Sequence, residues 1–137
     1  MPKVDAPASV IDPSALLALL QDGNGADEVV EAIAAGAAIS TVNLSEVLAK
    51  LAEHGQPAAV AVGAIHEATE GALRIEPFTE EDAAEWADLR PRSKAQGLSS
   101  GDRACLALAA RLEVPAATAD RDWRNLPEVG VAVKLIR

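Results

Sequence analysis

The chain has little of several residue types on which whole classes of protein depend. It contains one cysteine, two histidines and three aromatic side chains among 137 residues. A lone cysteine cannot form an internal disulfide, and Cys105 stands among alanines and leucines, so we expect a small buried hydrophobe rather than a nucleophile. With so few rings, we do not expect bases of a nucleic acid to stack on an aromatic platform.

Two other features are missing from the sequence. Residues 1–5 lack the basic segment and apolar stretch of a secretory signal, and no apolar run is long enough to span a bilayer. We therefore expect a cytoplasmic protein that does not contact membranes. Length, 50% hydrophobic residues and 24% charged residues predict a single folded domain over residues 1–137.

The charge is acidic in total but unevenly distributed. The net charge is -9, yet residues 89–137 hold nine basic and five acidic side chains. A basic segment can face phosphate, and here it includes one cluster at Arg92 and Lys94 and another at Arg121 and Arg124. The alternatives are that these are solvated surface charges, or that the acidic body attracts a basic protein partner.

Short apolar runs alternate with segments of helical periodicity. We expect strands at 9–11, 37–41, 73–78, 115–119 and 131–136, and helices at 15–20, 27–35, 43–54, 57–70, 79–86 and 99–112, with Pro91 ending the fifth helix. Such alternation predicts a three-layer α/β/α sandwich with a mostly parallel central sheet.

Four acids fall where that fold would gather them. Asp12 and Asp120 follow predicted strands, whereas Glu46 and Asp102 open predicted helices. All four could meet at the carboxyl edge of the sheet, where open α/β folds bind their ligands. Carboxylates crowded together repel unless a hard cation such as Mg²⁺ or Mn²⁺ lies between them, so the pattern indicates a divalent-metal site.

Each acid also has a purely structural explanation. Asp12 suits an N-cap, Glu46 a capping box with Asn43, Asp102 a position three after the cap Ser99, and Asp120 an Asx-turn. Capping explains why an acid is tolerated at one helix start. It does not explain why four such positions share one edge of a sheet.

The four acids lie in segments that resemble, in order and spacing, the acidic motifs of PIN domains. The segments are VIDPSALL (10–17), NLSEV (43–47), LSSGDRA (98–104) and TADRDW (118–123). The resemblance extends over nearly the whole chain and is strongest to the small VapC-like ribonuclease toxins of toxin-antitoxin pairs. It implies Mg²⁺- or Mn²⁺-dependent RNA cleavage, frequent homodimers, and inhibition by a cognate antitoxin that inserts a segment near the acidic pocket.

Roles can be assigned from the chemistry of phosphodiester hydrolysis, which needs an activated water and neutralised phosphate charge. Asp12, Asp102 and Asp120 would be direct or water-mediated metal ligands, and Glu46 would complete the site. Side chains that could hydrogen-bond the acids or waters are Ser14, Asn43, Ser99 and Thr118. Asp122 is a possible fifth acid or a solvent-facing turn residue, and possible RNA contacts are Arg92, Lys94, Arg103 and Arg121.

Two rival interpretations remain open. The chain could be a non-enzymatic interaction module whose acidic body binds a basic partner, or a PIN nuclease that acts in RNA maturation rather than as a toxin. Absence of metal binding and RNA cleavage would favour the first, and neighbouring genes would distinguish the second.

Overall fold

The computed structural model describes residues 6–93, 97–125 and 130–136, in which strands and helices alternate along the chain. The strands are β1 (Ser9–Ile11), β2 (Ala37–Ser40), β3 (Leu73–Glu76), β4 (Ala116–Thr118) and β5 (Val133–Leu135). The helices are α1 (Pro13–Leu20), α2 (Ala26–Ala34), α3 (Thr41–Glu53), α4 (Ala58–Ala68), α5 (Glu80–Ser93), α6 (Ser100–Leu112) and the short 3-10 helix η2 (Arg121–Asn125).

All five strands belong to one sheet in the order β3-β2-β1-β4-β5, and every pairing is parallel. From β1 the chain moves outward through β2 to β3, and then crosses back to β4 on the other side of β1. The strand order therefore reverses next to β1, which is where open α/β sheets bind ligands. The predicted sandwich with a mostly parallel sheet is confirmed.

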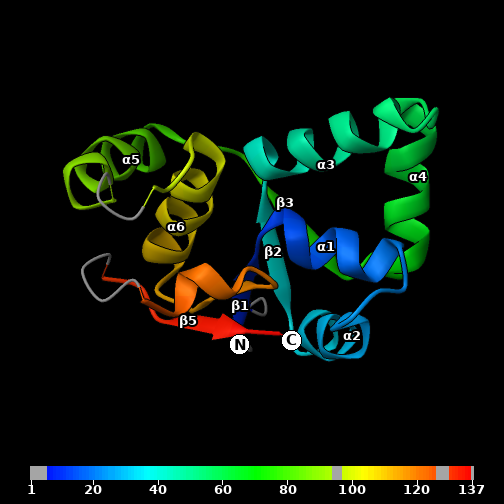
Figure 1. Cartoon of the computed structure of the whole chain (residues 1–137), viewed down its shortest axis with the longest axis horizontal. Helices are drawn as coiled ribbons and strands as arrows, with labels where there is room; N and C mark the ends of the chain where they lie inside the picture. Colours follow the sequence, from blue (N-terminus) through cyan, green and yellow to red (C-terminus); the bar gives the residue numbers. More distant parts are fainter. Residues whose placement is uncertain (1–5, 94–96, 126–129, 137) are drawn as a thin grey trace, which may run out of the picture.

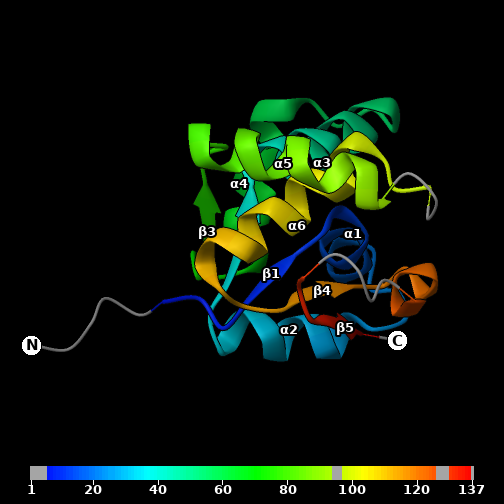
Figure 2. The same cartoon turned by 90° about the vertical axis from the view of Figure 1, so that its left-hand side faces the viewer.

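Alternate residues of the short strands face two separate cores. Ile11, Ile39 and Ala117 pack with α1, α2 and α4, whereas Val10 and Ala116 pack with α6 and Leu89 of α5. Figure 1 shows α5 and α6 on one side of the strands and α1, α2 and α4 on the other, and Figure 2 shows β1 and β4 between α6 and α2. Strands buried on both faces explain the continuous apolar runs in the sequence.

Most helix boundaries lie within two residues of the sequence-based expectation, and two differences change the interpretation. Helix α3 begins at Thr41, because the Ser40 hydroxyl caps it by accepting the Val42 N–H at 3.2 Å. Asn43 is therefore inside the first turn, and the predicted capping box of Asn43 with Glu46 is wrong. Helix α5 passes Pro91 and ends two residues later at Ser93, so it extends only briefly beyond the residue that cannot donate a backbone hydrogen bond.

Other local predictions are confirmed. Cys105 is fully buried in the α6 core. Ser99 caps α6, and Thr79 and Asp82 exchange the two hydrogen bonds of a capping box at the start of α5. Within the ranges described above, no helix is long and apolar enough to cross a membrane.

Candidate active site

Asp12 lies at the carboxyl end of β1 and is only 3% exposed. Its Oδ1 accepts the Ala15 N–H at 2.9 Å, so Asp12 is the predicted N-cap of α1. The same oxygen accepts the Ser14 hydroxyl at 2.7 Å, and Oδ2 accepts the Thr118 hydroxyl at 2.5 Å. An ionised carboxylate has about four acceptor positions, so capping leaves Asp12 capacity for a further partner.

The hydroxyls of Ser14 and Thr118 join α1 to the end of β4. Thr118 Oγ1 accepts the Asp120 N–H at 2.9 Å while it donates to Asp12. Ser14 Oγ accepts the Ala119 N–H at 3.0 Å while it also donates to Asp12. Two hydroxyls that each bond the carboxylate and the turn after β4 fix the position of Asp12 relative to Asp120.

Asp120 follows β4, and its side chain is exposed next to this network. Its Oδ1 accepts the Asp122 N–H at 2.9 Å, which is the Asx-turn that the sequence predicts. Asp122 itself is exposed in η2. The turn leads into η2, whose Trp123 packs in the core, and leaves the exposed Asp120 side chain at the carboxyl end of β4.

Glu46 lies one turn into α3 and reaches the start of α6 through Asn43. The Asn43 Nδ2 group donates to Glu46 Oε1 at 2.8 Å and to the Gly101 carbonyl at 2.9 Å. Asn43 is fully buried, whereas Glu46 is exposed. A residue expected to cap a helix therefore connects two helices.

Asp102 forms a complete capping box with Ser99. Its Oδ2 accepts the Ser99 N–H at 3.0 Å, and its own N–H donates to the Ser99 hydroxyl oxygen at 3.1 Å. The bonds of Ser99 are thus those of a helix cap rather than bonds to a neighbouring acid from another element. Asp102 remains partly exposed beside Gly101.

Electrostatic interactions show that the acids lie near one another. Burial raises the pKa of Asp12 above its ordinary value, and the charge of Asp102 raises it further, against lowering by the bonds from Thr118, Ser14 and Ala15. Burial likewise raises the pKa of Asp102, against lowering by the Ser99 bonds, and the charge of Asp120 adds to the rise.

The thiol of Cys105 brings Glu46 into the same group. Burial raises its pKa well above the ordinary value, and the charges of Asp12, Asp102 and Glu46 raise it further. Acids from three different segments therefore raise the pKa of the same buried thiol. Four segments of the chain that lie far apart in sequence bring their carboxylates to one edge of the sheet.

The sequence was compared with models of known protein families, and one model spans the four acidic segments. The sequence model of the PIN domain matches residues 9–129. The chain belongs to the PIN-domain family. PIN domains are nucleases, and the family resemblance inferred from the four acidic segments is confirmed.

Solved PIN-domain structures share the fold at low sequence identity. A chain of a toxin-antitoxin complex from Klebsiella pneumoniae is 21% identical with a TM-score of 0.67, covering 87% of this chain and 92% of that chain. VapBC2 from Rickettsia felis, bound to a DNA fragment from its promoter, is 14% identical with a TM-score of 0.73. The match covers 93% of this chain and 97% of that chain. FitAcB from Neisseria gonorrhoeae is 21% identical with a TM-score of 0.67, and the match covers 92% of this chain and 96% of that chain. No curated protein matches the chain.

The four acids supply the type of ligand that a hard cation prefers. Carboxylate oxygens are the ligands that Mg²⁺ and Mn²⁺ prefer, and the buried Asn43 Oδ1 has no hydrogen-bond partner in the described part of the chain. Among residues 6–93, 97–125 and 130–136, however, no three His, Cys, Asp or Glu side chains are close enough to hold one ion directly. The spacing suits an ion that keeps several of its waters.

The basic residues have different outcomes. Arg103 is only 9% exposed and stacks over the Trp86 ring at 3.7 Å, which argues against the predicted RNA contact. The sequence near Arg103 does not reveal this contact, because Trp86 lies on a different helix, α5. Arg121 is exposed immediately after Asp120. Lys94 and the side chain of Arg92 lie outside the described residues.

Sequence inspection missed Gly101. A methyl group at this position would overlap the Glu46 carboxylate, so the glycine leaves room for that side chain. A glycine within the first turn of an otherwise strong helix is unfavourable relative to alanine and often has a packing reason. A glycine at this position of a predicted helix could therefore have indicated a close neighbouring side chain.

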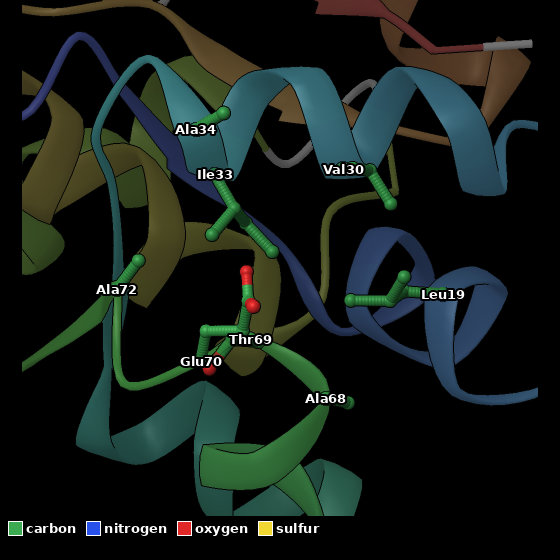
Figure 3. A pocket seen from close by; sticks show the side chains of 8 residues that line it. All are labelled: Leu19, Val30, Ile33, Ala34, Ala68, Thr69, Glu70 and Ala72. Carbon is green, nitrogen blue, oxygen red and sulfur yellow. The ribbon is translucent and has the colours of Figure 1, made fainter.

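Two of the concavities on the described surface involve α1. An open groove of about 360 Å³ runs between α1 and α3 from the acidic edge and is lined by Pro13, Leu17, Glu46, Ala49, Lys50 and Glu53. A smaller hollow of about 100 Å³ lies between α1, α2 and the end of α4, where Val30 and Ile33 face Leu19 and Ala68 (Figure 3). Only the first contains one of the four acids.

Proposed function

We propose that this PIN domain is a divalent-metal-dependent endoribonuclease and the toxin of a toxin-antitoxin pair. The observation that supports the proposal is a set of hydrogen bonds that link the segments of the four acids. The hydroxyls of Ser14 and Thr118 join Asp12 to the turn that carries Asp120. The Asn43 side chain joins Glu46 to the helix that carries Asp102. In a member of a nuclease family, such a cluster has an immediate chemical use.

Asp12, Asp102 and Asp120 would hold Mg²⁺ or Mn²⁺, directly or through waters, and Glu46 would complete the site. When bound, the cation neutralises phosphate charge and lowers the pKa of a coordinated water. Asp12 suits the central role because hydroxyls from α1 and from β4 fix its position. Removing negative repulsion among the acids would also favour their ionised forms.

The protein surface supplies a path for the substrate. The groove between α1 and α3 leads to Glu46 and contains Lys50, which can pair with a phosphate. Arg121 is exposed and follows Asp120 directly in the chain. We propose that both contact RNA, together with Arg92 and Lys94 of the basic cluster, whereas Arg103 is held against Trp86.

The proposed partner is an antitoxin protein. The structural relatives include chains of toxin-antitoxin complexes, some of them bound to DNA. We infer that this chain also pairs with an antitoxin, forms a homodimer, and acts in the cytoplasm on RNA. Light scattering of the purified protein tests the dimer, and co-expression with the protein encoded beside it tests the antitoxin.

A cleavage assay tests the central proposal. Purified protein is incubated with structured RNA and Mn²⁺, and the same assay is run with Asp12→Asn, Asp120→Asn and the control Asp27→Asn. Asp27 is exposed on α2, which carries none of the four acids. We expect the first two variants to lose at least a hundredfold in rate while the control cleaves like the parent. Undiminished cleavage in both site variants would reject the assignment.

The capping bonds of Asp12 and Asp102 are the observation that favours a non-enzymatic module. Under that interpretation the acids serve only helix starts. Mn²⁺ titration followed by calorimetry separates the two, because caps alone give no saturable binding. Binding without cleavage of any RNA would instead limit the proposal to a metal-binding PIN domain.

A further inference from the structure

The Asn43 carboxamide is a buried connection between α3 and α6. Its Nδ2 group donates one proton to Glu46 Oε1 and the other to the Gly101 carbonyl. Both partners are acceptors, so the nitrogen must lie on this side of the carboxamide, and its orientation is determined. Replacing Asn43 would leave a carboxylate and a carbonyl without their shared donor.

Gly101 provides the space that Glu46 occupies. A Cβ atom built on Gly101 would collide with both oxygens and the carboxyl carbon of Glu46. Gly101 is not among the glycines with positive φ, so the backbone conformation alone would accept alanine. A methyl group at this position would therefore require the end of the Glu46 side chain to move.

The position of Glu46 is also favoured electrostatically. Its carboxylate lies against the first turn of α6, a 13-residue helix whose N-terminal end carries partial positive charge. Asp102 is the next residue along that turn. An exposed glutamate of α3 is thus held against the helix turn that carries a second acid.

We propose that Asn43 and Gly101 form a clamp that positions the Glu46 carboxylate against the first turn of α6, the turn that carries Asp102. Asn43 holds the carboxylate by a hydrogen bond, and Gly101 admits it to the helix surface. Neither residue touches the substrate, so both are positioning residues. The consequence for ion binding rests on the proposed function, whereas the clamp itself is a property of the folded protein without metal.

The first test measures the clamp without metal or RNA. Unfolding midpoints are compared for the parent, Gly101→Ala, Glu46→Ala and the double variant in the presence of a chelator. Gly63→Ala is the matched control, because Gly63 lies in α4 and an added methyl there meets nothing within 4 Å. Gly63→Ala should raise the midpoint, since alanine is the better helix former.

Gly101→Ala should raise the unfolding midpoint less than Gly63→Ala does, or should lower it. The reason is that the new methyl group displaces Glu46 from Asn43. In the Glu46→Ala background the same substitution should raise the midpoint as the control does. Equal effects of Gly101→Ala in both backgrounds would overturn the clamp.

The second test measures what the clamp does for ion binding. Mn²⁺ affinity is determined by calorimetry for Asn43→Ala, Gly101→Ala, Glu46→Ala and the Asn43→Ala/Glu46→Ala pair. Each single variant should bind about tenfold more weakly, as loss of residues that orient metal ligands commonly does. The pair should bind no more weakly than Glu46→Ala alone.

The outcomes separate the two proposals. If Asn43→Ala weakens Mn²⁺ binding equally with and without Glu46, Asn43 does not act through Glu46 and the positioning role is rejected. If the parent binds no Mn²⁺, the proposed metal site fails, and the metal-free cycle still decides whether the clamp exists.

Discussion

Thr118 donates its hydroxyl proton to Asp12 at 2.5 Å, across two neighbouring parallel strands. The bond joins residues 106 positions apart in sequence and lies at the point where the strand order reverses. Both residues are buried, so the hydroxyl replaces part of the hydration that the carboxylate loses. The position of Asp12, the most buried of the four acids at this edge, therefore depends on a side chain from the other half of the chain.

Thr118→Val should destabilise the protein by about 2 kcal/mol near pH 7, because it removes a buried hydrogen bond to a charged group. Valine has nearly the shape of threonine, so packing changes little. Urea unfolding followed by circular dichroism measures the effect.

Thr69→Val is the matched control for Thr118→Val. Thr69 is also buried, but its hydroxyl bonds the Ile65 carbonyl within its own helix at 2.8 Å. Its loss should cost about 1 kcal/mol, as is usual for a neutral hydrogen bond. Equal losses for the two variants would mean that Thr118 does not stabilise a charged Asp12.

Asp12→Asn should change how the metal-free protein responds to pH. Burial raises the folded-state pKa of Asp12 above the ordinary 3.8, so the folded state binds this proton more tightly than the unfolded state. Stability therefore falls as pH rises from 3.8 through the higher folded-state pKa, and the loss persists above it. Asparagine cannot ionise and should avoid that loss, so the variant gains on the parent as pH rises.

The measurement for Asp12→Asn is urea unfolding with a chelator present at several pH values from 4 to 8. Glu53→Gln, an exposed acid on α3, is the control and should track the parent. Mn²⁺ at a hundred times its Kd should stabilise the parent by about 2.7 kcal/mol and Asp12→Asn much less. A pH profile unchanged by Asp12→Asn would contradict the predicted ionisation of a buried acid.

Much of this arrangement was predictable from the sequence because strand ends leave local signals. Ser9–Ile11 and Ala116–Thr118 are short apolar runs followed by an acid, and the structure places both acids at one edge. The resemblance of the acidic segments to PIN motifs predicted the family correctly. Local pattern and overall fold agree at these positions.

Other features were not predictable because they depend on partners distant in sequence. Asn43 has the spacing of a capping box with Glu46, and only the cap at Ser40 shows that the helix starts earlier. Arg103 looks like a surface cation until Trp86 from α5 covers it. Such tertiary contacts override local preferences without leaving a signal in the segment itself.

Arg111→Met should destabilise the protein by about 3 kcal/mol, because it removes the partner of a buried charge. Arg111 Nε donates to Asp82 Oδ1 at 2.7 Å, and the Asp82 side chain is fully buried. The pair joins α6 to α5, whose contact forms much of the second core. Chemical denaturation at neutral pH measures the loss.

Arg74→Met is the comparison for Arg111→Met. Arg74 pairs with Glu76 at the same distance of 2.7 Å, but its side chain is 44% exposed. Its loss should cost less than about 1 kcal/mol. Adding Asp82→Asn to Arg111→Met should restore part of the stability by removing the buried charge, and a further loss in that double variant would contradict the explanation.

Cys105 should react with a thiol reagent only when the protein unfolds. The side chain is fully buried, and burial together with the charges of Asp12, Asp102 and Glu46 raises its pKa, so almost no thiolate forms near neutral pH. Labelling with a chromogenic disulfide should be at least a hundredfold slower in buffer than in concentrated urea. Because the chain has one cysteine, the final extent in urea gives the reference of one thiol per chain. Rapid labelling in buffer would mean that α6 opens readily and that the acids beside Cys105 are not held in place.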